Sequence, residues 1–186
     1  KVTLTSKVTT IKANAFEESL VKEINFPKNL KSIGDSAFYH TPLTQVQFNE
    51  KLISIGDNAF SHCQLQSVYF PYSLETVGDF AFASNRELST ITLNNSCELN
   101  YNIFNDCTTY WSEPEPEDYD SKLIQRPITV NLGPKATVPL GDLISNLGEY
   151  ITFNVDPWNT HYYTKDGSLY KTRGNVKIYT PKAVTQ

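Results

Sequence analysis

Apolar and polar residues follow a repeating pattern through the first half of the chain. The stretch IGDSAF at 33–38 recurs as IGDNAF at 55–60 and VGDFAF at 77–82, so the pattern has a period of about 22 residues. The Ala-Phe pair that closes each stretch is also present one step earlier, at 15–16, and a variant, Ile-Phe, follows at 103–104. A fixed period of this length is typical of repeat architectures, in which each copy is one structural unit.

A second apolar block recurs in phase with the first. Its copies alternate apolar and polar residues, which predicts short strands with one buried face. These copies are LVKEINF (20–26), LTQVQF (43–48), LQSVYF (65–70) and LSTITL (88–93). A repeat this short cannot form a core alone, so we expect the copies to stack as coils about 4.8 Å apart, with each strand pairing with its equivalent in the next coil.

The recurring letters of the first block have candidate structural roles. The phenylalanines would fill the core, and the glycines would supply a left-handed turn that other residues resist. The glycines are Gly34, Gly56 and Gly78, with Asn100 in the same position of a later coil and Lys12 breaking the pattern in the first. The aspartates that follow them would each cap a short helical turn. They are Asp35, Asp57 and Asp79.

The combination of GDxAF and LxxIxF blocks resembles the BspA-type leucine-rich repeat, a bacterial surface repeat that is also found in some parasitic protists. The resemblance covers residues 1–108, although the first coil lacks Gly-Asp and the fifth has Tyr101 in place of the aspartate. It implies a β-rich α/β fold, a right-handed leucine-rich-repeat solenoid. The expected fold has seven or eight coils of about 22–23 residues each, with short strands and short helical turns.

The pattern changes after residue 108. The stretch at 110–121 is acidic and contains prolines, which predicts an exposed loop. Strand patterns then return at 128–132 (ITVNL) and 151–153 (ITF), and LGD at 140–142 echoes IGD. We therefore expect one solenoid over 1–186, with regular coils at 1–108, an acidic loop insertion at about 109–123 and degenerate coils at 124–186.

The stretch 159–181 also resembles a variant coil of this family, of the form N-x-x-Y…DG-x-LY…P. The matching residues are Asn159, Tyr162, Asp166, Gly167, Leu169, Tyr170 and Pro181. The competing interpretation makes 123–186 a small separate β domain.

Composition excludes several classes of protein. The net charge of −4 argues against a nucleic-acid-binding protein, which would carry a basic stripe. No apolar run approaches the length of a membrane span. The chain contains no methionine and starts at Lys1, so we expect it to be a trimmed piece whose targeting segment is not included. Three cysteines do not make a disulfide framework.

Two groups of residues could hold a metal ion. His40 and His62 would lie side by side in adjacent coils, next to Cys63, and these are zinc ligand types; the alternative is that both histidines are turn residues. A carboxylate run could form a weak calcium site, although a solvated loop is the simpler interpretation. The run comprises Glu113, Glu115, Glu117, Asp118 and Asp120. We predict that the protein has neither a metal site nor a cofactor.

The cysteines are expected to be core residues. Cys63 and Cys107 fall two coils apart, roughly 10 Å by the strand spacing, which is beyond the reach of a disulfide. A disulfide bond between Cys97 and Cys107 is an alternative that the sequence leaves open. The sequence NNS at 94–96 is a glycosylation acceptor in a secretory eukaryotic host.

Residues between the core positions of the strands should point outward and form a polar face. The candidate binding residues on it are Gln45, Gln47, Ser67, Tyr69, Thr90 and Thr92. Asn25, Thr129, Asn131 and Thr152 extend the same face. Repeat solenoids commonly bind partners across such faces. The alternative is that these residues merely suit an exposed sheet.

We predict a non-catalytic protein that binds other proteins, secreted or located at the cell surface. The resemblance implies adhesion to a host extracellular matrix or plasma protein, such as fibronectin or fibrinogen, or contact with other cells. One alternative is a structural spacer that presents another domain, and a remote one is an enzyme of unknown class. No known catalytic or phosphate-binding motif is present in the sequence. The ligand and the oligomeric state stay open.

Overall fold

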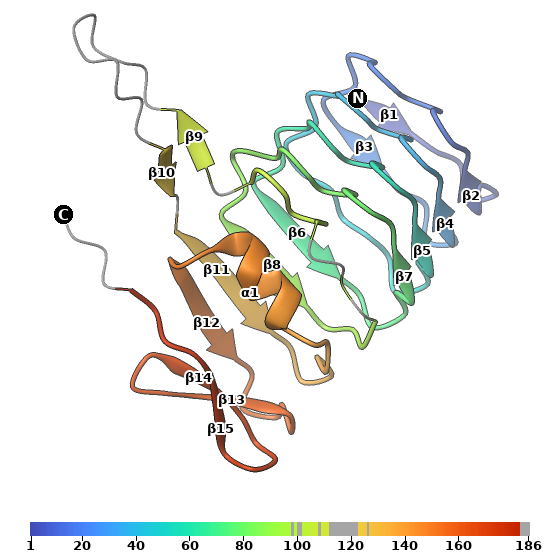
Figure 1. Cartoon of the computed structure of the whole chain (residues 1–186). Helices are drawn as coiled ribbons and strands as arrows, with labels where there is room; N and C mark the ends of the chain where they lie inside the picture. The colour runs from blue at the N-terminus through green and yellow to red at the C-terminus, as the bar shows by residue number, and fades with distance from the viewer. Residues whose placement is uncertain (98, 100–101, 108, 112–122, 126, 183–186) are drawn as a thin grey trace, which may run out of the picture.

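The computed structural model describes residues 1–97, 99, 102–107, 109–111, 123–125 and 127–182. The chain winds into a β-solenoid of about six turns with very little helix, as Figure 1 shows. The prediction of a repeat solenoid built mainly from strands is thus confirmed. The right-handed winding and the count of seven or eight coils stay predictions.

Two parallel sheets run along the solenoid. The first has the order β2-β4-β5-β7. Its two-residue strands are β2 (Thr10–Ile11), β4 (Ser32–Ile33), β5 (Ser54–Ile55) and β7 (Thr76–Val77). They come just before the GD motif, where the sequence pattern predicted only a turn.

The second sheet has the order β12-β11-β8-β6 and contains the predicted LxxIxF strands. Its members are β6 (Ser67–Phe70), β8 (Thr90–Leu93), β11 (Ile128–Leu132) and β12 (Ile151–Val155). A separate parallel pair, β1 (Val2–Thr3) and β3 (Ile24–Asn25), belongs to the first turn of the chain. We refer to the outward side of β6, β8, β11 and β12 as the strand face.

The strand predicted at 43–48 is absent, although its alternating burial is present. Leu43, Val46 and Phe48 are all buried in the core. The amides of Gln64 and Gln66 donate to the carbonyls of Leu43 and Thr44, and the segment forms no strand after that point. Buried and exposed side chains therefore alternate in this segment as predicted, although its backbone does not form the hydrogen bonds of a strand.

The turns that carry the Ala-Phe pair stack directly on one another. The amides of Ser36, Phe38 and His40 donate to carbonyl oxygens of the next coil at 2.8–2.9 Å. These segments are successive turns and not the short helical turns that we expected. Within the described part of the chain, the α-helix α1 (Gly141–Leu147) is the only helix, and it holds the LGD echo in its first turn.

The phenylalanines of the repeat form a continuous column in the core. Ring centroids are 5.0 Å apart between Phe16 and Phe38, 5.1 Å between Phe38 and Phe60, and 5.3 Å between Phe60 and Phe82. Phe104 continues the column at 5.8 Å from Phe82. The predicted role of these residues as core fillers is confirmed.

The prediction of left-handed glycines is wrong. Positive φ angles occur instead at the third residue of GDxAF and at the residue two after the phenylalanine. The first set is Asn14, Ser36, Asn58 and Phe80, and the second is Glu18, His40, His62, Ser84 and Asp106. Non-glycine residues rarely adopt this conformation, so stacking against the neighbouring coil must stabilise it.

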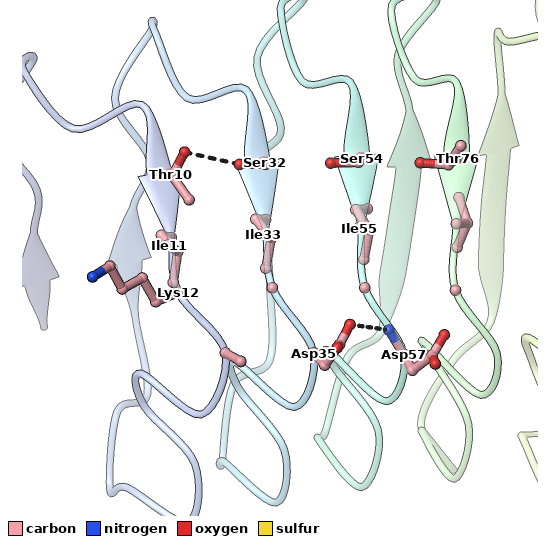
Figure 2. Close-up of a pocket in the computed structure, with 15 residues that line it drawn as sticks. Thr10, Ile11, Lys12, Ser32, Ile33, Asp35, Ser54, Ile55, Asp57 and Thr76 are labelled. Carbon is pink, nitrogen blue, oxygen red and sulfur yellow. Dashed lines mark hydrogen bonds between the residues drawn. The ribbon is translucent and has the colours of Figure 1, made fainter.

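The glycines are needed because the preceding coil lies too close for a side chain. A Cβ atom at Gly56 would lie 2.2 Å from Asp35 Oδ1 and 2.6 Å from the Asp35 amide nitrogen. At Gly78 the equivalent distances to Asp57 are 2.3 and 2.4 Å. Lys12 occupies the same position in the first coil, and its side chain points away from the stack (Figure 2). Asn100 lies outside the described residues.

The aspartates of the motif bond to the next coil instead of capping a helical turn. The amide of Asp57 donates to Asp35 Oδ1 at 3.0 Å, and the amide of Asp79 donates to Asp57 Oδ1 at 2.8 Å. Figure 2 shows the first of these bonds, between Asp35 and Asp57. Gly-Asp therefore works as a contact between coils.

The chain rejoins the strand face after the acidic insertion. Strand β9 (Thr109–Trp111) pairs antiparallel with β10 (Leu123–Gln125), and β11 then pairs in parallel with β8. This parallel pairing supports our proposal of one solenoid over a separate β domain. The carboxylate run of the insertion lies outside the described residues.

The stretch 159–181 does not add another parallel strand to the strand face. It forms an antiparallel three-stranded sheet, which we call the C-terminal meander. Its strands are β13 (Tyr162–Lys165), β14 (Ser168–Lys171) and β15 (Val176–Tyr179). Asp166 and Gly167 both have positive φ, so the DG pair turns the β13–β14 hairpin.

Replacing Phe60 by alanine should lower the free energy of unfolding by about 3–5 kcal/mol, because the fully buried ring packs between two others. Replacing the exposed Gln47 should cost less than about 0.5 kcal/mol. Denaturant unfolding of the two variants measures both values. Equal losses would contradict the phase that we assign to the repeat.

Replacing Gly56 by alanine should destabilise the protein by about 1–3 kcal/mol, because the new methyl group meets Asp35 of the preceding coil. Gly141 is the matched control, since a Cβ there meets nothing within 4 Å. Its replacement by alanine in α1 should be neutral or stabilising by up to about 1 kcal/mol. Thermal unfolding compares the two, and a similar loss at both sites would refute the close approach.

Candidate functional site

The strand face carries two straight rows of polar side chains. The parallel register places Ser67, Thr90, Thr129 and Thr152 in one row. The second row contains Tyr69, Thr92, Asn131 and Asn154. Four of the six predicted binding residues therefore lie together, in the order that stacking predicts. Whether they bind a partner stays a prediction.

Hydrogen bonds between strands fix the second row. Asn131 Nδ2 donates to Thr92 Oγ1 at 3.2 Å, and Asn154 Nδ2 donates to Asn131 Oδ1 at 3.0 Å. The side-chain amides are thus oriented along the row. A partner would meet a preorganised polar surface, which lowers the entropic cost of binding.

Tyr69 begins this row and is held by a neighbouring coil. Its hydroxyl donates to Glu50 Oε1 at 2.9 Å. Partial burial, together with the Glu50 carboxylate, raises the pKa of Tyr69 above its ordinary value. The phenol therefore stays protonated at neutral pH. Its half-exposed ring is the only aromatic group in the two rows.

Gln45 and Gln47 lie apart from the rows, in a polar hollow of about 680 Å³. The hollow lies where the strand pairing is interrupted between β3 and the segment 43–48. Lys1, Lys22 and Asn25 also line it. The six predicted residues thus divide between one straight surface and one hollow.

The sequence pattern missed a third polar row, on the first sheet. Thr10, Ser32, Ser54 and Thr76 help to line a groove of about 500 Å³. Figure 2 shows these four side chains in a row along the first sheet. Ser32 Oγ donates to Thr10 Oγ1 at 2.9 Å. The signal was a hydroxyl residue before each aliphatic residue in successive repeats, but strands of two residues have no alternation to recognise.

Comparison with known proteins shows the family of the chain. The profile of the BspA type leucine-rich repeat region matches residues 1–110 in six copies. This protein belongs to that family. A search of curated proteins found no match.

Two solved structures resemble the BspA-type chain. The crystal structure of the pneumococcal vaccine antigen PcpA has a TM-score of 0.60 at 18% identity, covering 96% of this chain and 46% of that one. A leucine-rich repeat protein from Bacteroides ovatus ATCC 8483 has a TM-score of 0.56 at 23% identity, covering 80% and 36%. At these identities the likeness shows the fold alone. The chain spans less than half the length of either protein.

The two histidines of the BspA-type repeat are turn residues. Both have positive φ, and their ring centroids are 6.1 Å apart. Cys63 Sγ is directed into the coil, where it donates to the Phe38 carbonyl at 3.2 Å. Within the part of the chain that the structure describes, no three metal-ligating side chains come together. The zinc hypothesis therefore gains no support.

A buried hydrogen-bonding position lies three residues after Phe60, Phe82 and Phe104, and the sequence did not reveal this role. Asn85 Nδ2 donates to the Phe60 carbonyl at 2.8 Å, and Cys107 Sγ donates to the Phe82 carbonyl at 3.1 Å. Cys63 makes the same contact one coil earlier. The residue types differ between coils, so only their shared spacing could have identified this role. In these three coils the position ties the coil to the one before it.

All three cysteines are free and buried, so neither Cys97 nor Cys107 forms the bridge that the sequence left open. Asn94, the candidate glycosylation residue, is also engaged, since its Oδ1 accepts a hydrogen bond from the Lys135 amide at 3.2 Å. Among the described residues, no helix is long and apolar enough to cross a membrane.

The cysteines should resist alkylation in the folded protein. Burial raises the pKa of Cys63 and Cys97, and it raises the pKa of Cys107 from 9.0 to about 12. The thiolate is the reactive form, so at about pH 8 the thiolate fraction of Cys107 is roughly a thousandfold lower than that of an ordinary cysteine. Iodoacetamide labelling followed by mass spectrometry, with and without guanidinium, measures this protection. Rapid labelling of Cys107 in the folded protein would contradict its burial.

Proposed function

We propose that this chain is a non-catalytic, protein-binding repeat region of a secreted or cell-surface protein, and that it acts in adhesion. Membership of the BspA-type family supports a surface role. The observation that carries the proposal is the pair of polar rows on the strand face. Its partner would be a protein, such as a host matrix or plasma protein.

The strand face suits a protein partner better than a small molecule. Its residues come from successive coils in register and lie side by side on one open sheet. Tyr69 offers a ring and a hydroxyl, the combination that is enriched among residues dominating binding energy at protein interfaces. The amides of Asn131 and Asn154 supply fixed polar contacts beside it. Gln45 and Gln47 would extend this surface toward the first coils.

A structural spacer is the second candidate. The chain covers 46% and 36% of the two similar structures, which leaves room in such proteins for other parts. A spacer would keep the same core and bind nothing through its strand face. The core features alone therefore do not separate the two functions, and a binding measurement does.

Binding of the purified chain to immobilised fibronectin and fibrinogen tests the adhesive role. We expect saturable binding that weakens about tenfold or more when Tyr69 and Asn131 are both replaced by alanine. The control replaces Ser54 and Thr76 by alanine on the first sheet, and its affinity should be unchanged. Biolayer interferometry gives both values.

Two outcomes would count against the proposal. Absence of saturable binding to these proteins would favour the spacer. An equal loss in the control variant would show that the strand face is not the binding surface. Circular dichroism of each variant checks that the solenoid is intact.

A further inference from the structure

A second hollow, of about 570 Å³, lies between the C-terminal meander and the coil segment that follows β11. Thr137 lines it from the coil side. From the meander side it is lined by Thr160, His161, Lys171 and Arg173. It shares no residue with the strand-face rows or with the hollow beside Gln45 and Gln47.

The charged groups of this hollow are all of one sign. Lys171 and Arg173 line it, and no acidic residue does. Among the described residues, neither cation belongs to an ion pair, whereas Arg86 pairs with Asp106 at 2.8 Å. The whole chain carries a net charge of −4, so this local excess of positive charge runs against the composition. An unneutralised pair of cations in a concave site attracts anions.

Lys171 reaches the hollow from strand β14, and Arg173 reaches it from the turn after that strand. Tyr162 pairs with Lys171 across β13 and β14, and both line the hollow. The next pair, Tyr163 and Tyr170, stacks with ring centroids 5.2 Å apart on the other side of the sheet, as alternation requires. Arg173 lies in the turn that follows β14 and also lines the hollow.

Buried hydrogen bonds hold the walls in place without a ligand. Asn159 Nδ2 donates to the carbonyls of Gly133 and Ala136 at 2.7 and 3.0 Å, which ties the start of the meander to the coil. The hydroxyl of Tyr162 donates to the Val138 carbonyl at 2.7 Å. Thr160 Oγ1 lies 3.2 Å from His161 Nδ1 and positions that ring. A preformed site loses less entropy when it binds.

We propose that this hollow binds a tetrahedral oxyanion carried on a small molecule, namely a phosphate or sulfate ester. The guanidinium group of Arg173 can form paired hydrogen bonds to such an oxyanion, and Lys171 adds a compact positive charge. The hydroxyls of Thr137 and Thr160 are further donors. The volume lies within the range of small-ligand pockets, so the ester of a single sugar is the expected size of ligand.

Isothermal titration of the intact chain at low ionic strength tests this site. The probes are glucose 6-phosphate, glucose 6-sulfate, glucose and glucuronate. We expect saturable binding of at least one of the two esters, no binding of glucose, and glucuronate weaker by about tenfold, because a carboxylate offers two acceptor oxygens and an ester oxyanion offers three. The comparison of the two esters distinguishes phosphate from sulfate as the natural group.

Variants locate the binding. Arg173→Gln and Lys171→Gln should each weaken binding of the preferred ester about tenfold or more, because each removes a charge-assisted hydrogen bond. The matched control is Lys177→Gln, in which the same charge is lost from a lysine that lies over the Tyr170 ring at 5.5 Å from its centroid. That variant should change the affinity less than about twofold.

Three results would overturn the proposal: no saturable binding of either ester, equal affinity for glucuronate, or an equal loss in the Lys177 variant. An equal loss in the Lys177 variant would show that the ester is attracted by the overall positive charge of the meander and does not bind at a defined site. All three replaced side chains are exposed, so the variants should keep the melting temperature of the parent chain. The result does not depend on the strand face, and adhesion could fail while this site binds.

Discussion

The structure depends on hydrogen bonds that run from one coil to the next. At the Ala-Phe turns, alternate backbone amides donate to carbonyl oxygens of the following coil, as those of Phe38 and His40 do. The Asp35 carboxylate and the Asn85 side chain add further bonds between coils. In the described coils of the repeat, backbone amides at these turns find their partners in a neighbouring coil, so a coil depends on its neighbour for stability. The column of phenylalanine rings follows the same geometry, because rings stacked at about 5 Å require coils at that spacing.

The sequence predicts the parts of this fold that depend on period alone. The Phe38 and Phe60 positions, and the strands at β6 and β8, follow from the fixed repeat length and from alternation. Gly56 shows where this reasoning reaches its limit. A glycine is required either by a positive φ or by lack of space, and both causes leave the same letter in the sequence. Here the cause is a neighbour in the preceding coil, while the positive φ angles belong to Ser36, Asn58 and Phe80, which share no residue type.

The candidate sites divide in the same way. The polar rows of the strand face could be predicted, since register follows from stacking and outward positions follow from alternation. The segment 43–48 has the same alternation yet lacks the ladder, because pairing depends on the backbone of its neighbours. The hollow beside Lys171 and Arg173 could not be predicted, since it arises where the segment around Thr137 packs against a meander that comes much later in the chain. Local pattern carries no information about that packing.

The contact between Gly56 and Asp35 has a consequence for how such a chain can change length. Gly56 faces the aspartate of the preceding copy, and the same pair of residue types meets again at Gly78 and Asp57. A duplication or loss of one whole repeat, from any starting point among these regular coils, would place a glycine against an aspartate once more. The junction chemistry would be unaltered, and no compensating substitution would be needed. Arrays built this way can lengthen or shorten by unequal recombination while every internal boundary stays compatible.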